Sequence, residues 1–233
     1  MSVLLLKLAG PLQAWGSSSR FAYRGTEVAP TKSGVIGMLA AARGLRRTDP
    51  LTDLLGLEFG VRIDQPGRVV RDFQTARSLD GRSSAPLTYR FYLSDAVFLA
   101  AVGGDRELLC GVAEALDRPR FPLYLGRRSC PPDGRVSLGV HEESLDDALT
   151  SWPWLAADWH RRRAARTVRL EIIRDGRPGE PITETVPDEP VSFDPAHRRH
   201  TWRVVVRRHV DIANDLAERA AVAEHDPLSL LGG

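Results

Sequence analysis

Three short clusters in the first 140 residues combine glycine with basic or aromatic side chains, a pattern typical of nucleic-acid contacts. They span residues 10–16 (GPLQAWG), 31–34 (TKSG) and 124–131 (YLGRRSCP). Trp15 could stack on a base, and the Gln13 amide could read a base edge. Lys32 stands at an expected helix start, where free backbone N–H groups favour phosphate. The residues expected to contact nucleic acid are Gln13, Trp15, Gly16, Lys32, Ser33, Gly34, Tyr124, Gly126, Arg127, Arg128 and Ser129.

Each cluster also has an ordinary structural interpretation. A tryptophan after a strand can simply pack under a turn, and Thr or Ser before a helix can simply cap it. Arg127 and Arg128 could form a charged surface turn, but Gly126 beside them allows close approach of the backbone to phosphates. Because all three clusters fall on expected loops of one small domain, we interpret them together as a surface for a polyanion.

The positions of the histidines argue against catalysis in this region. All six lie beyond residue 140, at His141, His160, His197, His200, His209 and His225. Metal-independent RNA cleavage usually needs a positioned acid and base, most often histidine. His197 and His200 are three residues apart, but no further ligands follow at spacings suited to zinc. We therefore expect no catalytic residue, no metal site and no cofactor.

The charge distribution favours a polyanion partner for the first part of the chain. Net charge is only +2, yet residues 1–140 hold 19 Lys+Arg against 13 Asp+Glu, and residues 141–233 hold 13 against 17. Among the 32 basic residues only Lys7 and Lys32 are lysine. Arginine offers a planar fork for phosphate, although a biased genomic composition would also enrich it. The basic tract 160–163 (HRRR) could meet RNA, DNA or an acidic protein face, or could be a solvated linker.

The elements that must position these clusters alternate between strands and helices. Hydrophobic periodicity predicts helices that start at Thr31 or Ser33 and at Asp105, and strands at residues 2–8, 58–64, 69–75, 87–93, 96–102 and 136–140. This order predicts an α+β, ferredoxin-like (RRM-like) domain over residues 1–140, with a long β-hairpin at about 69–93. Residues 141–233 are expected to form a small β-rich C-terminal subdomain and tail.

The compartment follows from what the sequence lacks. The two cysteines form no C-x-x-C pair, so a disulfide scaffold is not expected. No apolar run approaches the ~20 residues needed to span a bilayer. The N-terminus has no basic region before its apolar run and is interrupted by Lys7, which is unlike a signal peptide. We expect a cytoplasmic protein.

Five blocks together resemble a known family. Residues 8–16 (LAGPLQAWG), 30–37 (PTKSGVIG), 71–75 (RDFQT), 90–96 (RFYLSDA) and 124–131 (YLGRRSCP) resemble, in order and spacing, the signature blocks of the CRISPR-associated Cas-five family. The similarity is to its type I-E branch, a subunit of the surveillance complex called Cascade. It covers roughly residues 2–140 and is faint beyond them.

The resemblance implies a non-catalytic subunit that holds the 5′ handle of the crRNA and caps the backbone of the complex in antiviral defence. The hairpin would act as a thumb, served by Arg71, Arg90 and Tyr92, that reaches over the RNA towards the backbone subunit CasC. The chain would also meet the large subunit CasA, and would meet target DNA only indirectly, through the complex. Arg46 and Arg47, just past the first expected helix, are further candidates for RNA backbone contacts.

The main alternative is a metal-independent endoribonuclease that processes pre-crRNA. Some Cas-five relatives of another CRISPR subtype do this with Tyr, Lys and His together. Here cleavage would have to recruit Tyr23, Lys32 or a distant histidine. A generic RNA-recognition module outside CRISPR is a third option.

Overall fold

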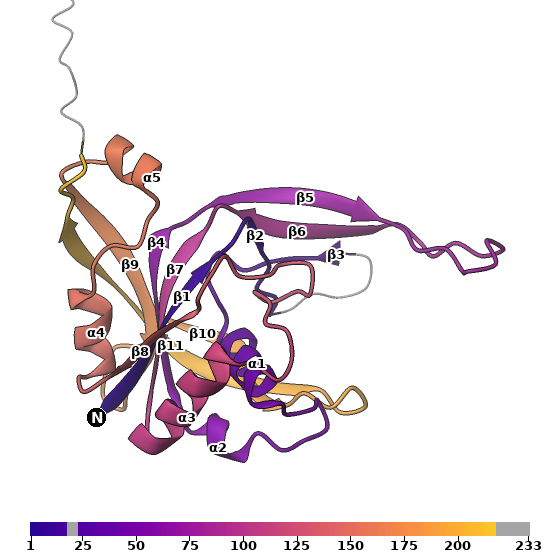
Figure 1. The fold of residues 1–233 in the computed structure, drawn as a ribbon, viewed down its shortest axis with the longest axis horizontal. Coiled ribbons are helices and arrows are strands. Elements are labelled where there is room, and N and C mark those ends of the chain that lie inside the picture. Colours follow the sequence, from indigo (N-terminus) through magenta and orange to yellow (C-terminus); the bar gives the residue numbers. More distant parts are fainter. Residues whose placement is uncertain (18–22, 218–233) are drawn as a thin grey trace, which may run out of the picture.

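The computed structural model describes residues 1–17 and 23–217 of the chain, and these form a broad sheet with helices on both faces and a projecting hairpin (Figure 1). The helices are α1 (Lys32–Arg43), α2 (Thr52–Leu55), α3 (Arg106–Asp117), α4 (Leu145–Ser151) and α5 (Asp158–Arg163). The strands are β1 (Ser2–Ala9), β2 (Leu12–Gln13), β3 (Tyr23–Arg24), β4 (Glu58–Gln65), β5 (Arg68–Gln74), β6 (Thr88–Ser94), β7 (Val97–Gly104), β8 (Ser137–His141), β9 (Thr167–Asp175), β10 (Glu184–Ser192) and β11 (Arg199–Ala213). The α+β class and all six strands predicted for the first part are confirmed.

The large sheet has seven strands in the order β10-β11-β9-β4-β7-β1-β8, and every neighbouring pair is antiparallel. β9 pairs with β4, with Val61 opposite Ile173. The strands after residue 140 therefore extend the same sheet. The boundary predicted at residue 140 does not separate two sheets, because β9 pairs along the edge of β4 that β7 leaves open. Residues 218–233 of the predicted second domain lie outside the described residues.

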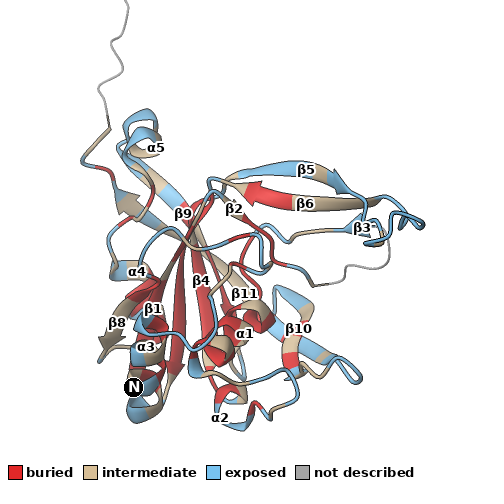
Figure 2. Ribbon diagram, turned by 45° about the vertical axis from the view of Figure 1, so that its right-hand side comes forward, coloured by how far each residue is buried: buried red, intermediate tan, exposed pale blue. Residues whose placement is uncertain are grey.

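Alternating side chains of β1 supply both faces of this sheet. Leu4, Leu6 and Leu8 belong to the large core that α1 and α3 cover. Val3 and Leu5 belong to a second core on the other face, where α4 packs. This period of two is what a strand buried on both faces requires. Figure 2 shows the buried strands between the helical layers. Because α4 covers the second face, the sheet surface that RNA-recognition modules expose is closed around β1 and β7.

Helix α1 begins and ends where its sequence predicts. The Thr31 side chain accepts a hydrogen bond from the Gly34 backbone N–H at 3.2 Å, which identifies Thr31, rather than Ser33, as the N-cap. Gly44 ends the helix at φ +83°, a left-handed conformation that favours glycine. Gly34 is required by packing, because a Cβ there would lie 2.8 Å from the Trp15 ring.

The hairpin predicted for residues 69–93 is present as β5 and β6, which pair antiparallel with Arg71 opposite Phe91. β6 also pairs with β2 and β3 in a second sheet. The hairpin projects from the body of the molecule, and its tip, residues 75–87, is exposed (Figure 1). Val69 and Phe73 are 60% and 67% exposed, so the hairpin does not contribute these side chains to the core of the chain.

Strand β10 was not predicted, because Pro187 and Pro190 interrupt its sequence. Proline is tolerated only on edge strands or at bulges. β10 is the edge strand of the large sheet, and its register with β11 shifts at both prolines. Helix α5 was also missed; it covers the basic tract 160–163. No helix among the described residues is long and apolar enough to cross a bilayer.

Candidate nucleic-acid interface

An arginine-lined groove of about 1030 Å³ lies between α1, the segment 121–129, the base of the hairpin and the turn between β10 and β11. Its lining includes seven arginines: Arg24, Arg46, Arg47, Arg90, Arg127, Arg128 and Arg198. No Asp or Glu of the described residues lines it. A concave surface with one sign of charge concentrates the field and attracts a polyanion.

Apolar side chains form another part of the same lining. They come from α1 and its end, from the segment 121–129 and from the β10–β11 turn: Met38, Leu45, Phe121, Leu123 and Phe193. Tyr124 joins them at the groove surface. Arginine forks suit phosphates, and exposed apolar and aromatic faces suit unstacked bases. The lining therefore combines the two chemistries that single-stranded nucleic acid needs.

None of the seven groove arginines has a carboxylate partner for its guanidinium group among the described residues. Within residues 1–17 and 23–217, no carboxylate forms an ion pair with any of the seven. Arg127 donates instead to backbone carbonyl oxygens. The Nε of Arg90 is buried and has no hydrogen-bond partner among the described residues. Buried polar groups normally have partners, so Arg90 is an unsatisfied donor at a positive surface.

Gln13 and Trp15 do not face the groove as side chains, and the prediction that they contact bases is wrong. Both are fully buried. The Gln13 amide donates to the carbonyl oxygens of Leu8 at 3.2 Å and Ala96 at 2.7 Å, and its oxygen accepts from Trp15 Nε1 at 3.0 Å. The Gln13–Trp15 pair fixes the loop after β1, and the Trp15 ring packs against α1 at Gly34. Trp15, although buried, and the exposed Gly16 both line a smaller cavity of about 380 Å³ beside the groove.

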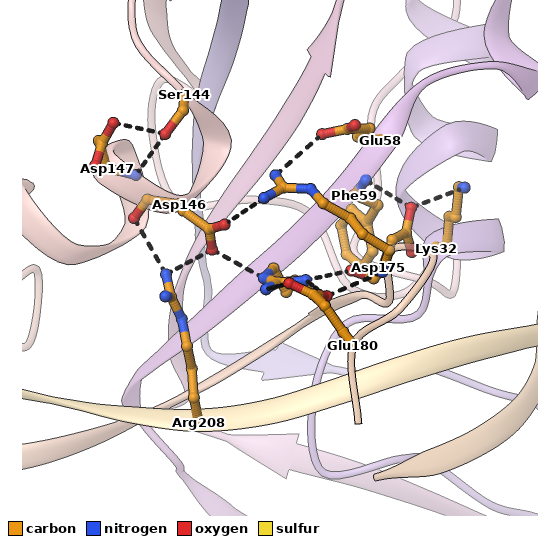
Figure 3. A network of polar contacts seen from close by, with 11 residues as sticks. Lys32, Glu58, Phe59, Ser144, Asp146, Asp147, Asp175, Glu180 and Arg208 are labelled. Atoms are coloured by element: carbon orange, nitrogen blue, oxygen red, sulfur yellow. Dashed lines mark hydrogen bonds and ion pairs between the residues drawn. The ribbon is translucent and has the colours of Figure 1, made fainter. Parts of the chain in front are cut away.

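Lys32 is also internal, so the prediction that its ammonium binds phosphate is wrong. It is 6% exposed, and its Nζ pairs with Asp175 at 3.1 Å and Glu189 at 2.9 Å. Its backbone N–H donates to Asp188 Oδ2 at 2.8 Å, so a carboxylate already occupies the start of α1. Figure 3 shows Lys32 turned towards Asp175. Ser33 and Gly34 line both cavities.

The two neighbouring arginines of the third cluster have different surroundings. Arg127 donates to the carbonyl oxygens of Phe91 at 3.0 Å, Arg24 at 2.7 Å and Gly25 at 3.1 Å, and lies 4.8 Å above the Tyr92 ring. It therefore ties β3, β6 and the segment 121–129 together. Arg128 and Ser129 are exposed at the groove surface.

Gly126, beside these arginines, allows the two loops to meet. A Cβ at Gly126 would lie 1.8 Å from the Ala14 carbonyl oxygen, and the residue has φ +84°. Both conditions require glycine. Gly126 thus serves close packing of the loops and also lines the groove.

The predicted thumb residues lie on different faces of the hairpin. Arg90 lines the groove, whereas Arg71, opposite Phe91 in the register, belongs to the other face and lies 5.6 Å from the Tyr89 ring centre. Successive strand residues alternate between faces, so Arg71 and Arg90 cannot contact the same phosphate. Tyr92 is buried at the base of the hairpin beneath Arg127.

The family model described as CRISPR-associated protein (Cas_Cas5) matches residues 3–206. The chain belongs to the CRISPR-associated Cas-five family. This Cas-five chain is 36% identical over 165 residues to "CRISPR system Cascade subunit CasD" of Escherichia coli strain K12, a match that covers 61% of the chain and 73% of that protein.

Two solved structures resemble this Cas-five chain over almost its whole length. One, described as "CRISPR RNA-guided surveillance complex", has a TM-score of 0.74 and 32% identity, covering 94% of this chain and 95% of that one. The other, "Crystal structure of Cas protein", has a TM-score of 0.70 and 35% identity, covering 93% and 98%. The similarity therefore includes the strands after residue 140.

The titratable groups around the groove are poorly suited to acid–base chemistry. Burial raises the pKa of the Cys130 thiol, which keeps it neutral. Burial, and then the positive charge of Arg198, lower the pKa of His200. No group of three or more metal-ligating side chains gathers in the part of the chain that the structure describes. Among the groove-lining residues only Tyr124 and the arginines carry a titratable side chain. The described lining therefore offers cationic, aromatic and apolar contacts to a ligand.

Four basic or aromatic groove residues were not predicted: Arg24, Phe121, Phe193 and Arg198. Arg24 is part of no recognisable motif. It is placed opposite Arg90 by the two-residue strand β3, which pairs parallel with β6 and is too short to predict from sequence. Arg198 and Phe193 lie in the segment assigned to the second domain. Their basic and aromatic character was the only available signal, and it is shared by many other residues.

Proposed function

We propose that this Cas-five chain is a non-catalytic, guide-RNA-binding subunit of a CRISPR surveillance complex that holds the 5′ handle of the crRNA in the arginine-lined groove. The observation that carries the proposal is the groove itself, with seven arginines and no described carboxylate in its lining. The similarity to CasD, and to a chain of an RNA-guided surveillance complex, supports the same assignment.

The groove chemistry supports single-stranded RNA as the ligand. Arg46, Arg47 and Arg128 are exposed and free to bind phosphates, while Phe121 and Tyr124 offer faces for bases. A flexible single strand can turn its phosphates and bases to different walls, whereas a duplex keeps its bases stacked inside. Ser33 and Gly34 also line the groove, and both are small enough to let the RNA backbone come close.

The architecture supports a ferredoxin-like (RRM-like) core with an unusual binding surface. The strand order β8-β1-β7-β4, with α3 between β7 and β8 and α1 between β1 and β4, is that of the split βαβ arrangement. In this chain α4 packs against the face opposite α1 and α3. The RNA would therefore lie along the loops and the hairpin base rather than across the sheet.

The projecting hairpin supports contacts with neighbouring subunits. Val69 and Phe73 of the hairpin and Tyr23 of the adjoining β3 are exposed. Exposed apolar and aromatic side chains that gather in one region are typical of a protein–protein contact. We assign this hairpin to the thumb that reaches the backbone subunit CasC, and other surfaces of the chain to the large subunit CasA. Target DNA is then met only indirectly, through the complex and its guide.

The direct test mixes the full chain with a labelled guide RNA carrying its repeat-derived handle, without metal. Native and denaturing gels are run at two salt concentrations, and an RNA with a scrambled handle serves as control. We expect a shift that weakens with salt and with scrambling, while the RNA stays intact. Absence of a shift, or equal binding of the scrambled handle, contradicts the proposal.

The endoribonuclease alternative finds little support in the site. Lys32 is held by two carboxylates, and Tyr23 stacks on Tyr89 at 5.2 Å, where β3 joins the hairpin. Neither lines the groove beside a histidine. Cut RNA on the denaturing gel, retained in protein from a nuclease-deficient preparation, is the result that would favour this alternative.

A further inference from the structure

The turn between β10 and β11, residues 193–198, reaches the groove from a part of the chain far away in sequence. Phe193, Pro195 and Arg198 line the groove. We propose that this turn is a third wall of the RNA site and that Arg198 binds a phosphate of the handle where the groove meets the smaller cavity. The proposal rests on the proposed function and extends it to the C-terminal strands.

The position of Arg198 distinguishes it from the other basic residues of the turn. It lines both the groove and the smaller cavity of about 380 Å³, as Arg24 and Arg127 do. Unlike that of Arg127, the guanidinium groups of Arg24 and Arg198 have no described hydrogen bond to the backbone. That cavity is at the small end of ligand pockets and suits a single nucleotide. A phosphate at the shared boundary would join a nucleotide in the cavity to the next nucleotide in the groove. Two arginines without described carboxylate partners at this boundary suit that phosphate.

The conformation of the turn is determined by its own hydrogen bonds. The Asp194 carboxylate accepts from the Ala196 N–H at 2.8 Å, and the Asp194 carbonyl oxygen accepts from the His197 N–H at 3.0 Å. Such Asx-type bonds fix a short turn without help from a partner. The Phe193 ring packs against α1: a Cβ placed at Gly37 would lie 3.5 Å from the Phe193 Cζ atom. Arg198 is therefore held at the groove before any RNA binds.

The strands behind the turn are anchored to α1 by charge. Lys32 of α1 pairs with Glu189 of β10 at 2.9 Å, and Arg203 of β11 pairs with Asp188 at 2.8 Å. Asp188 also accepts the Lys32 backbone N–H. The buried carboxylates and cations set the distance between α1 and β10, and so the width of the groove between α1 and the turn.

Arg198 and Arg199 offer a matched pair for the test. Both are exposed arginines next to each other, but Arg199 does not line either cavity. With the full chain and labelled handle RNA, we expect R198A to lower the affinity about tenfold and to reduce the slope of log K against log salt by about 0.7. R199A should leave both unchanged. R198K should retain the slope and recover part of the affinity, because it keeps the charge without the fork.

Separate outcomes overturn this proposal and the proposed function. R128A, on the opposite wall, reports on the groove alone. If R128A weakens binding while R198A behaves like R199A, the third wall is wrong and the groove assignment stands. If neither R128A nor R198A changes the affinity or the salt slope, the groove assignment itself is wrong. Thermal unfolding of each variant confirms that the comparison is between folded proteins.

Discussion

Two groups of arginines in this molecule have the same side chain and different surroundings. In the groove, Arg46, Arg47 and Arg128 face solvent with no described carboxylate within ion-pair distance. In the C-terminal strands, Arg174 and Arg203 each pair with two carboxylates, at 2.7–2.8 Å. Figure 3 shows part of this second group: Asp146 of α4 pairs with Arg174 of β9, and Glu180, in the segment after β9, pairs with the same arginine. The internal partners, and not the residue type, indicate which arginines are left for an external anion.

The difference also has an energetic meaning. Unpaired cations that line one groove repel one another, which opposes folding slightly, and a bound polyanion removes that repulsion. Paired cations inside the fold behave in the opposite way, because removal of one partner leaves an uncompensated buried charge. Substitutions in the first group should therefore affect RNA binding, and substitutions in the second should affect stability.

The largest effect on stability is expected for R62M. Arg62 is fully buried, pairs with Asp64 at 2.6 Å, and donates to the carbonyl oxygens of Leu149, Trp152 and Pro153. Its loss leaves the Asp64 carboxyl buried without its counter-charge and should cost about 3–5 kcal/mol, measured by urea unfolding. R106A, which breaks an exposed pair with Glu142, should cost less than about 1 kcal/mol. Equal effects of the two variants would contradict the comparison.

The largest effect on binding is expected for the triple variant R46A/R47A/R128A. Loss of three phosphate contacts should lower the affinity on the order of a hundredfold or more and reduce the salt slope by about 2, measured by filter binding with handle RNA. The melting temperature should change little, because these side chains have no described ion pairs. The matched control is R162A/R163A/R166A, three exposed arginines on and after α5. A comparable loss in that control would show that the basic tract 160–163 binds RNA instead.

An intermediate case is the adjacent pair Arg127 and Arg128. R127A removes hydrogen bonds to three carbonyl oxygens at the hairpin base, so it should lower the melting temperature and speed proteolysis of the hairpin as well as weaken RNA binding. R128A should flatten the salt slope without changing the melting temperature. Reversal of these two phenotypes would show that the roles of the two arginines are exchanged.

The smallest effect concerns pH. A hydrogen bond from Arg174, then the Arg177 backbone N–H, lower the pKa of Glu180 to about 2. A depressed carboxyl pKa stabilises the folded state above the ordinary value near 4.5, and that contribution is lost as the pH falls towards 2. The melting temperature of E180Q should therefore be slightly below that of the native chain at pH 6, and the two should converge near pH 2. RNA affinity at neutral pH should be the same for both; a loss in E180Q would show that the paired group also supports the groove.

Much of the architecture could be read from local sequence because its causes are local. The alternation of leucines in β1, the Thr31 cap, the Gly44 stop and the 68–94 hairpin depend on neighbours within a few residues. β10 could not be read in this way, because only its edge position in the sheet makes Pro187 and Pro190 acceptable. The family resemblance rested on motifs of the first 140 residues, and the comparisons confirm the family over residues 3–206.

The sequence by itself determined the class of the fold, the order of its elements in the first part, the family and the region that supplies most of the arginines of the groove. Only the tertiary structure decided the task of each side chain. Trp15 and Lys32 have side chains suited to RNA, but both are buried. Trp15 is packed in the core, and Lys32 is bound by carboxylates that lie more than 140 residues away in the sequence. Arg198 has no motif but is brought to the groove by the β10–β11 turn. Burial and ion pairing depend on long-range neighbours, and a local pattern of residues does not contain them.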